Sequence, residues 1–142
     1  MPARIAEATW NGTLNEGNGN VKLGSGAYDG PYNFKSRFED GSETNPEELL
    51  GAAHAGCFSM ALGARLGREG FTVNSIHTVA HVHLEKGESG FGISRIDLVT
   101  EGDVAGIDAE TFKTHAEATK DTCIISRALA SVPMTVTASL KS

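Results

Sequence analysis

The sequence predicts an α+β fold in which an antiparallel β-sheet wraps on helices. Stretches typical of strands, with alternating apolar residues and glycine-rich turns, are segregated along the chain from stretches typical of helices. This segregation differs from the regular strand–helix alternation of a parallel βαβ fold. With 142 residues and no linker, repeat or low-complexity tract, the chain is expected to form a single domain over residues 1–142.

The N-terminal part of the chain is predicted to consist of strands joined by turns. Strands are expected over residues 9–14, 21–23 and 32–39. Glycine- and asparagine-rich segments over residues 15–20 and 24–30 supply the turns between them. No G-x-G-x-x-G or P-loop spacing precedes a helix here, so nothing indicates a nucleotide site.

A helix is expected next, over about residues 46–68. Asn45 suits the N-cap, Pro46 suits the first helical position, and two carboxylates in the first turn suit the helix dipole. Glycines at the far end terminate the pattern. Because residues 49–62 are apolar almost all round, this helix is expected at the centre of the molecule.

A hairpin is predicted after the helix. Residues 73–84 alternate between the two faces of a strand, with three histidines on one face. A turn over residues 86–90 leads into a partner strand over residues 91–100. Such a short connection favours an antiparallel pair.

The C-terminal part is expected to contain two helical segments and a last strand. Asp108 is a suitable cap for a helix that runs to about Lys120. Cys123 begins a further short helical piece, and Pro133 begins the strand. Apolar and hydroxyl residues alternate in that strand, so one of its faces is expected to point inward.

Composition excludes several kinds of partner. A net charge of −6 and a pI near 5.3 disfavour nucleic acids and membrane surfaces, which attract basic patches. No apolar run is expected to approach the roughly 20 residues that span a bilayer, and the N-terminus has no apolar signal core. We therefore expect a cytoplasmic protein, in a compartment where a disulfide is more often catalytic than structural.

The two cysteines lie 66 positions apart in different surroundings. Cys57 is within the small, apolar helical run, and Cys123 follows the polar end of the second long helix. One interpretation is packing, because burial raises a thiol's pKa and only the thiolate is a strong nucleophile. The other is a redox pair in which one cysteine attacks and the second resolves. The second interpretation requires a cation near the attacking thiol.

Arg37 and Glu47 are the candidate activating pair. Arg37, expected at the end of a strand, would favour the thiolate of Cys57, and a carboxylate would hold the arginine's fork in place. Ten residues of helix separate Glu47 from Cys57, a rise of roughly 15 Å that one side chain does not cover. If both belong to one site, the glutamate comes from a second copy of the chain, which predicts a homodimer with composite sites.

The histidines suggest two further sites. His54 lies one helical turn before Cys57, where it either forms a Cys–His dyad or is satisfied by a neighbouring backbone or hydroxyl group. His77, His81 and His83 share a strand face; they either ligate a metal or form the solvated side of the sheet. We favour the second alternative in both cases and expect no metal and no bound cofactor.

Residues 44–62, TNPEELLGAAHAGCFSMAL, resemble the signature of the OsmC/Ohr family of thiol-dependent hydroperoxide reductases. They match the osmotically inducible OsmC branch more closely than the organic-hydroperoxide-resistance (Ohr) branch. The resemblance extends to residues 8–10, 36–39, 70–72, 106–108, Cys123 and 140–142. It therefore covers nearly the whole chain.

This resemblance implies a swapped homodimer in which curved antiparallel sheets enclose two long central helices. It makes Cys57 the peroxidatic cysteine, Cys123 the resolving cysteine, and Arg37 and Glu47 their activating pair. The implied reaction reduces an organic hydroperoxide to an alcohol through a Cys57 sulfenic acid and a Cys57–Cys123 disulfide, which an external dithiol of lipoyl type then reduces. Relatives commonly carry proline after the second cysteine; Ile124 stands here, and is expected to alter the mobility of Cys123.

Two interpretations compete with the peroxidase. A non-catalytic dimeric protein that binds small apolar molecules would use the cysteines only for packing. A hydrolase built on Cys57 and His54 would turn over acyl esters without any need for Cys123. The response of the thiols to peroxide distinguishes all three.

Overall fold

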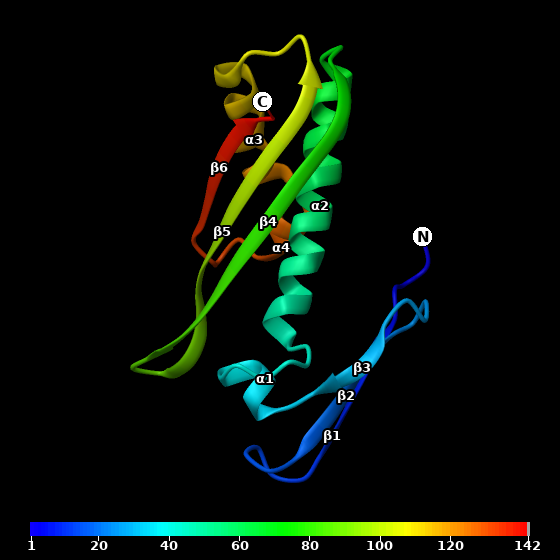
Figure 1. The fold of residues 1–142 in the computed structure, drawn as a ribbon, viewed down its shortest axis with the longest axis vertical. Helices are drawn as coiled ribbons and strands as arrows, with labels where there is room; N and C mark the ends of the chain where they lie inside the picture. Colours follow the sequence, from blue (N-terminus) through cyan, green and yellow to red (C-terminus); the bar gives the residue numbers. More distant parts are fainter. Residues whose placement is uncertain (142) are drawn as a thin grey trace. The chain divides into compact units, whose positions relative to one another are not determined.

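The computed structural model describes residues 1–141 (Figure 1). The chain forms two compact units, an N-terminal unit over residues 1–49 and a C-terminal unit from residue 50 onward. Strands and helices occur in both, so the predicted α+β class is confirmed. The single domain over residues 1–142 stays a prediction.

The N-terminal unit contains a three-stranded antiparallel sheet in the order β1-β2-β3. Its strands are β1 (Ala6–Asn11), β2 (Asn18–Leu23) and β3 (Asp29–Tyr32). Gly19 on β2 has no side chain to separate the aromatic rings of Trp10 and Tyr32, whose centroids lie 5.4 Å apart. A Cβ at that position would come within 2.8 Å of both rings, so the aromatic contact requires glycine.

The predicted strand over residues 32–39 is wrong beyond its first residue, because a short helix, α1 (Phe34–Phe38), occupies this segment. Asn33 and Ser36 form a capping box: the Asn33 side chain accepts from the Ser36 backbone N–H at 2.9 Å, and the Ser36 hydroxyl accepts from the Asn33 N–H at 2.9 Å. These two bonds satisfy backbone donors that a helix start leaves unpaired. Local capping therefore overrides the strand propensity of the aromatic residues.

The predicted long helix is confirmed as α2 (Pro46–Arg68). Asn45 caps it as expected, since its side chain accepts from the Glu48 backbone N–H at 2.7 Å. The same side chain donates to the Ser36 carbonyl at 2.9 Å. Asn45 thus fixes α1 against the first turn of α2.

The C-terminal unit is organised on a sheet of order β4-β5-β6 (Figure 1). The long strands β4 (Thr72–Gly87) and β5 (Gly90–Ala105) form the predicted antiparallel hairpin, with a left-handed Gly90 (φ 104°) closing a two-residue turn. The last strand, β6 (Met134–Leu140), instead pairs parallel to β5. A parallel neighbour is possible because the intervening helical segment carries the chain back to the same end of the sheet.

That crossover consists of α3 (Ala109–Thr122) and α4 (Ile124–Ala128). Asp108 caps α3 as predicted, accepting from the Thr111 N–H at 2.7 Å. The helices α2 and α3 meet on one face of the sheet in a single apolar core. Its buried members are Phe58, Leu62, Leu66, Ile96, Leu98, Phe112, Ala116 and Cys123.

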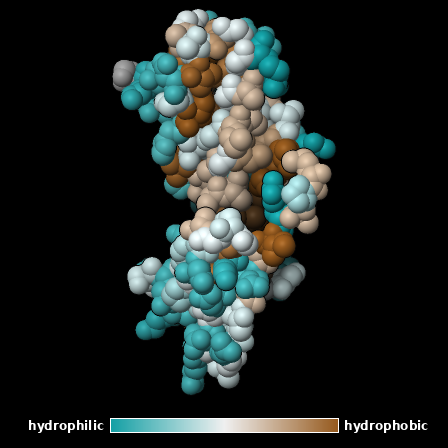
Figure 2. All heavy atoms as spheres, turned by 90° about the vertical axis from the view of Figure 1, so that its right-hand side faces the viewer, coloured by the Kyte–Doolittle hydropathy of each residue, from teal (hydrophilic) through white to brown (hydrophobic). Residues whose placement is uncertain are grey.

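Only one face of α2 is buried, although the sequence predicted a fully central helix. The outward face remains apolar and exposed, with Met60 at 78% exposure. Figure 2 looks toward this side of the C-terminal unit, where tan and brown apolar atoms extend along α2. Between the exposed charged residues Glu48 and Arg68, the exposed residues of α2 are small except for Met60: Ala52, Ala53, Gly56, Met60, Ala64 and Gly67.

By length and composition, α2 is apolar enough to cross a bilayer, with a mean hydropathy of 1.2 over its most apolar window. The expectation that no apolar run approaches this length is therefore wrong. Composition alone does not distinguish such a span from the core helix of a water-soluble protein. Here Phe58, Leu62 and Leu66 pack against the sheet and α3, as in a core helix.

Candidate functional site

The structure brings the two cysteines together. Cys57 lies midway along α2, and Cys123 is the residue at which α3 ends and α4 begins. Their sulfur atoms are 3.0 Å apart, and both are free thiols. Cys123 is 1% exposed, whereas Cys57 is partly exposed. A disulfide between them needs only a small approach of the two sulfurs.

The environment of Cys57 combines opposing influences on its thiol. Burial raises the pKa of Cys57, and its contact with the Cys123 thiol raises it further. The nearby backbone N–H groups of Ile125 and, to a smaller degree, Ile124, at the start of α4, lower this pKa. As far as the C-terminal unit is described, no cation adds to this effect. A thiolate here requires a positive group from elsewhere.

Ile124 follows the second cysteine directly and lies at the surface. Ile124 is the first residue of α4, and its side chain is 72% exposed. A proline here would fit the start of a helix but has no N–H to offer. The Ile124 N–H, which has a minor lowering influence on the Cys57 pKa, is the group that a proline here would remove.

Arg37 and Glu47 form a second pair, in the N-terminal unit. The Arg37 Nε donates to Glu47 Oε1 and its Nη2 donates to Oε2, each at 3.0 Å, in the bidentate geometry predicted for the fork. Glu47 is 9% exposed, and the guanidinium carbon of Arg37 lies 5.4 Å from the Phe38 ring centroid. Arg37 extends from α1 and not, as predicted, from the end of a strand.

A cavity of about 230 Å³ adjoins Arg37 and was missed by sequence reasoning. Most of its lining is apolar or aromatic. The lining residues are Trp10, Leu14, Tyr32, Asn33, Phe34, Arg37 and Phe38. The sequence signal for this cavity is the concentration of aromatic residues in the first 38 positions. In the sequence analysis, we interpreted those residues only as strand formers.

The four predicted site residues thus appear as two pairs. Arg37 and Glu47 meet within the N-terminal unit, and Cys57 and Cys123 meet within the C-terminal unit. Each pair has the internal geometry that a shared site requires. Their assembly into one site stays a prediction.

His54 is bound to a hydroxyl group. Its Nε2 is 2.7 Å from the Ser126 Oγ, and both residues are buried, at 0% and 3% exposure. Burial lowers the pKa of His54, so the imidazole is neutral at neutral pH. Of the two alternatives for this residue, the structure favours a histidine satisfied by a neighbouring hydroxyl over a Cys57–His54 dyad.

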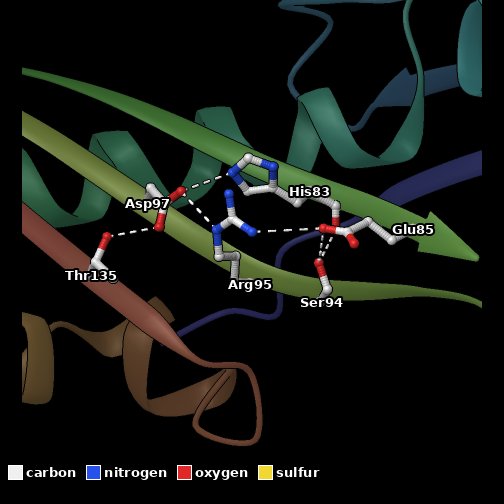
Figure 3. A network of polar contacts seen from close by, with 6 residues as sticks. All are labelled: His83, Glu85, Ser94, Arg95, Asp97 and Thr135. Atoms are coloured by element: carbon white, nitrogen blue, oxygen red, sulfur yellow. Dashed lines mark hydrogen bonds and ion pairs between the residues drawn. The ribbon is translucent and has the colours of Figure 1, made fainter. Parts of the chain in front are cut away.

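His83 belongs to a polar network on the sheet (Figure 3). Its Nε2 donates to Asp97 Oδ2 at 2.8 Å, the Arg95 Nε donates to the same oxygen at 3.0 Å, and Thr135 donates to Oδ1 at 2.7 Å. His77 and His81 are exposed on β4. Within residues 1–141, no group of three or more His, Cys, Asp or Glu side chains is arranged to hold a metal ion.

The Asp97 carboxyl is expected to titrate at low pH. The Thr135 hydrogen bond, followed by those from Arg95 and His83, lowers its pKa from 3.8 to about 2. A depressed carboxyl pKa stabilises the fold at pH values above the ordinary pKa of 3.8, and this contribution is lost as pH falls through about 2.

Thr135→Val should raise the Asp97 pKa toward 3.8, as measured by NMR titration. Thr137→Val, an exposed position on the same strand, should leave it unchanged; an Asp97 pKa near 3.8 in the unmodified protein would contradict the network.

Comparison with known proteins gives consistent matches. The sequence model of the family described as OsmC-like protein matches residues 39–138, a range that includes Glu47, Cys57 and Cys123 but not Arg37. The chain is 48% identical over 124 residues to peroxiredoxin OsmC of Escherichia coli (strain K12), covering 87% of each protein, and equally similar to that of Shigella flexneri.

Solved structures share the fold. The organic hydroperoxide resistance protein OhrB of Bacillus subtilis has a TM-score of 0.72 at 25% identity, over 96% of this chain and 98% of that one. An organic hydroperoxide resistance protein OsmC from Legionella pneumophila has a TM-score of 0.71 at 21% identity, over 100% and 98%.

Proposed function

The chain belongs to the OsmC-like protein family, and from this premise we propose that it is a thiol-dependent peroxidase that reduces organic hydroperoxides to alcohols. The observation that carries the proposal is the 3.0 Å separation of the Cys57 and Cys123 sulfurs. Two inert packing cysteines have no reason to meet, whereas an attacking and a resolving thiol must do so.

The first step uses Cys57 as the nucleophile. Its thiolate attacks the terminal oxygen of the hydroperoxide, the O–O bond breaks, and the departing alkoxide takes a proton to become the alcohol. The sulfur loses two electrons and is left as a sulfenic acid, while the peroxide gains them. The Arg37 guanidinium stabilises the thiolate and the charge that develops on the departing oxygen.

The second step uses Cys123. Its sulfur attacks the sulfenic sulfur of Cys57, the S–O bond breaks, and hydroxide leaves with the thiol proton as water. An external dithiol, of lipoyl type by family resemblance, reduces the resulting disulfide by thiol–disulfide exchange. Sulfur carries the whole redox change, so the cycle needs no bound cofactor. We propose that the protein works in the cytoplasm.

The cavity beside Arg37 supports an organic substrate. Its aromatic lining, from residues such as Trp10, Tyr32 and Phe38, suits an alkyl or aryl group better than a small hydrated peroxide. The guanidinium at the same cavity suits the peroxide oxygens. We expect faster reaction with cumene hydroperoxide than with hydrogen peroxide.

Two copies of the chain complete the site in this proposal. Glu47 and Cys57 lie on one unbroken helix, ten residues and roughly 15 Å apart, and the Arg37 fork is bound to Glu47. The Arg37–Glu47 pair therefore acts on the cysteines of a second copy. The exposed apolar face of α2 is the surface that a second copy would cover.

Mixed dimers test the composite site. We expect Arg37→Met and Cys57→Ser proteins to be inactive separately, because each removes an essential part of both sites. Mixing them under conditions of subunit exchange should restore roughly a quarter of the unmodified activity, since half of the dimers then hold one intact site out of two. Peroxide consumption measures the recovery. A mixture that stays inactive after demonstrated exchange, or full activity in a monomeric sample, would contradict composite sites.

The peroxidase chemistry is tested by mass measurement after one equivalent of cumene hydroperoxide. We expect the loss of two hydrogen atoms with no added oxygen, which indicates a Cys57–Cys123 disulfide. An unchanged mass would leave the cysteines inert and favour a protein that only binds small apolar molecules. A single added oxygen that persists would show that Cys123 does not resolve the sulfenic acid.

A further inference from the structure

Two side-chain contacts link α2 to the start of α4: His54 with Ser126, and Cys57 with Cys123. On each side, the two contacting residues are three positions apart in the sequence. On α2, His54 precedes Cys57 by three residues; on the other side, Ser126 follows Cys123 by three. The His54 Nε2 is 2.7 Å from the Ser126 Oγ, and the cysteine sulfurs are 3.0 Å apart. Because residues three apart on a helix are neighbours, each end of the polar contact lies one turn from a sulfur.

The His54–Ser126 contact is buried and directional. Both residues are almost fully buried, and the other ring nitrogen of His54, Nδ1, has no hydrogen-bond partner. Ser126 is thus the one polar partner that the described structure gives to this imidazole. A buried hydrogen bond fixes distance and orientation more narrowly than apolar packing does, because a buried polar group left without a partner destabilises the fold.

The position of Cys123 depends on how α4 is held. Cys123 has extended backbone geometry (φ −56°, ψ 135°) between two helices, and α4 has only five residues. Ile125 and Leu129 pack against the core, while Ile124 is exposed. Apolar contacts of this kind tolerate sliding, so a directional bond is needed to fix the sulfur of Cys123 relative to α2.

We propose that His54 and Ser126 are positioning residues that hold the Cys57 and Cys123 sulfurs within bonding distance. This role rests on the proposed function, in which Cys123 displaces hydroxide from the Cys57 sulfenic acid. The competing reaction is attack by a second hydroperoxide, which adds another oxygen to the sulfur and yields the sulfinic acid. Correct positioning favours the disulfide over this irreversible product.

The first test measures the cysteine pair without peroxide. Ser126→Ala removes the hydroxyl, and His54→Phe removes the ring nitrogens while keeping a planar ring in the core. In glutathione buffers, each variant should form the Cys57–Cys123 disulfide about tenfold less favourably, equivalent to about 30 mV in reduction potential. The double variant should be no worse than either single one, because both changes break one bond. Additive losses would overturn the proposal.

The second test measures the two chemical steps separately. With cumene hydroperoxide, sulfenic acid should form in Ser126→Ala at the unmodified rate, whereas its conversion to disulfide should slow by about tenfold to a hundredfold. The sulfinic acid fraction, measured by mass, should rise accordingly. Unmodified resolution rates would overturn the proposal. If the unmodified protein does not react with hydroperoxide at all, the proposed function fails, while the glutathione equilibrium still decides the positioning role.

A matched control excludes general loss of stability. Thr100 is fully buried and its hydroxyl contacts Thr78 at 3.0 Å within the same unit. Thr100→Val therefore also removes a buried hydroxyl contact, but between β4 and β5. It should leave both the glutathione equilibrium and the resolution rate unchanged. An equal shift in this variant would assign the effect to stability and overturn the proposal.

Discussion

Replacing Cys57 by serine is expected to abolish hydroperoxide reduction, lowering the rate by roughly three orders of magnitude or more. The serine hydroxyl does not ionise near neutral pH and is a poor nucleophile toward peroxide oxygen, so no sulfenic acid forms. The measurement is consumption of cumene hydroperoxide with a dithiol reductant. Because Cys57 is only partly buried, the change should cost about 1 kcal/mol of stability at most.

The control for this variant is its fold. An unchanged melting profile and an unchanged Arg37–Glu47 pair would show that only the nucleophile has been removed. Ser59→Ala, two residues further along α2, changes a hydroxyl that contacts Thr78 and should retain activity. Peroxidase activity that survives in Cys57→Ser would reject Cys57 as the nucleophile.

Replacing Cys123 by serine is expected to permit one round of reaction and then stop turnover. Cys57 still attacks the hydroperoxide, but the nearest group to the sulfenic acid is then a hydroxyl that does not resolve it. A burst of about one equivalent of alcohol per chain should be followed by a steady rate at least about tenfold below normal. Mass measurement should find oxygen added to Cys57 and no disulfide.

The two cysteine variants together separate the steps of the cycle. Cys57→Ser should show neither burst nor turnover, whereas Cys123→Ser should show the burst alone. Sustained turnover of Cys123→Ser with dithiols would mean that an external thiol resolves the sulfenic acid directly. Cys123 would then be dispensable in spite of its 3.0 Å contact with Cys57.

Local sequence signals predicted the elements that depend on local interactions. The helix α2 was predicted within a residue because its cap and its apolar run lie in the same segment, and the β4–β5 hairpin followed from alternation and a short turn. The strand predicted over residues 32–39 failed because the Asn33–Ser36 capping box is a weaker pattern than the aromatic residues around it. The parallel pairing of β6 depends on where a crossover returns the chain, which no local pattern encodes.

The candidate site divides in the same way. The Arg37–Glu47 pair joins residues ten positions apart and was predicted from their charges, their places beside the helix start and the family resemblance. Contact between Cys57 and Cys123, 66 positions apart, followed from family resemblance and not from spacing. The His54–Ser126 bond spans 72 positions, so its hydroxyl partner was not identifiable before the fold was known.

In the proposed cycle, the unequal exposure of the two cysteines would determine how the oxidised protein is regenerated. Cys123 is 1% exposed, whereas Cys57 is partly open to solvent. An incoming reductant would therefore reach the Cys57 side of the bond, and the transient mixed disulfide would form there. Cys123 would be the leaving group and would return to a position shielded from further oxidant. Under this proposal, regeneration would have a fixed regiochemistry, with Cys57 reacting both with the peroxide and with the reductant.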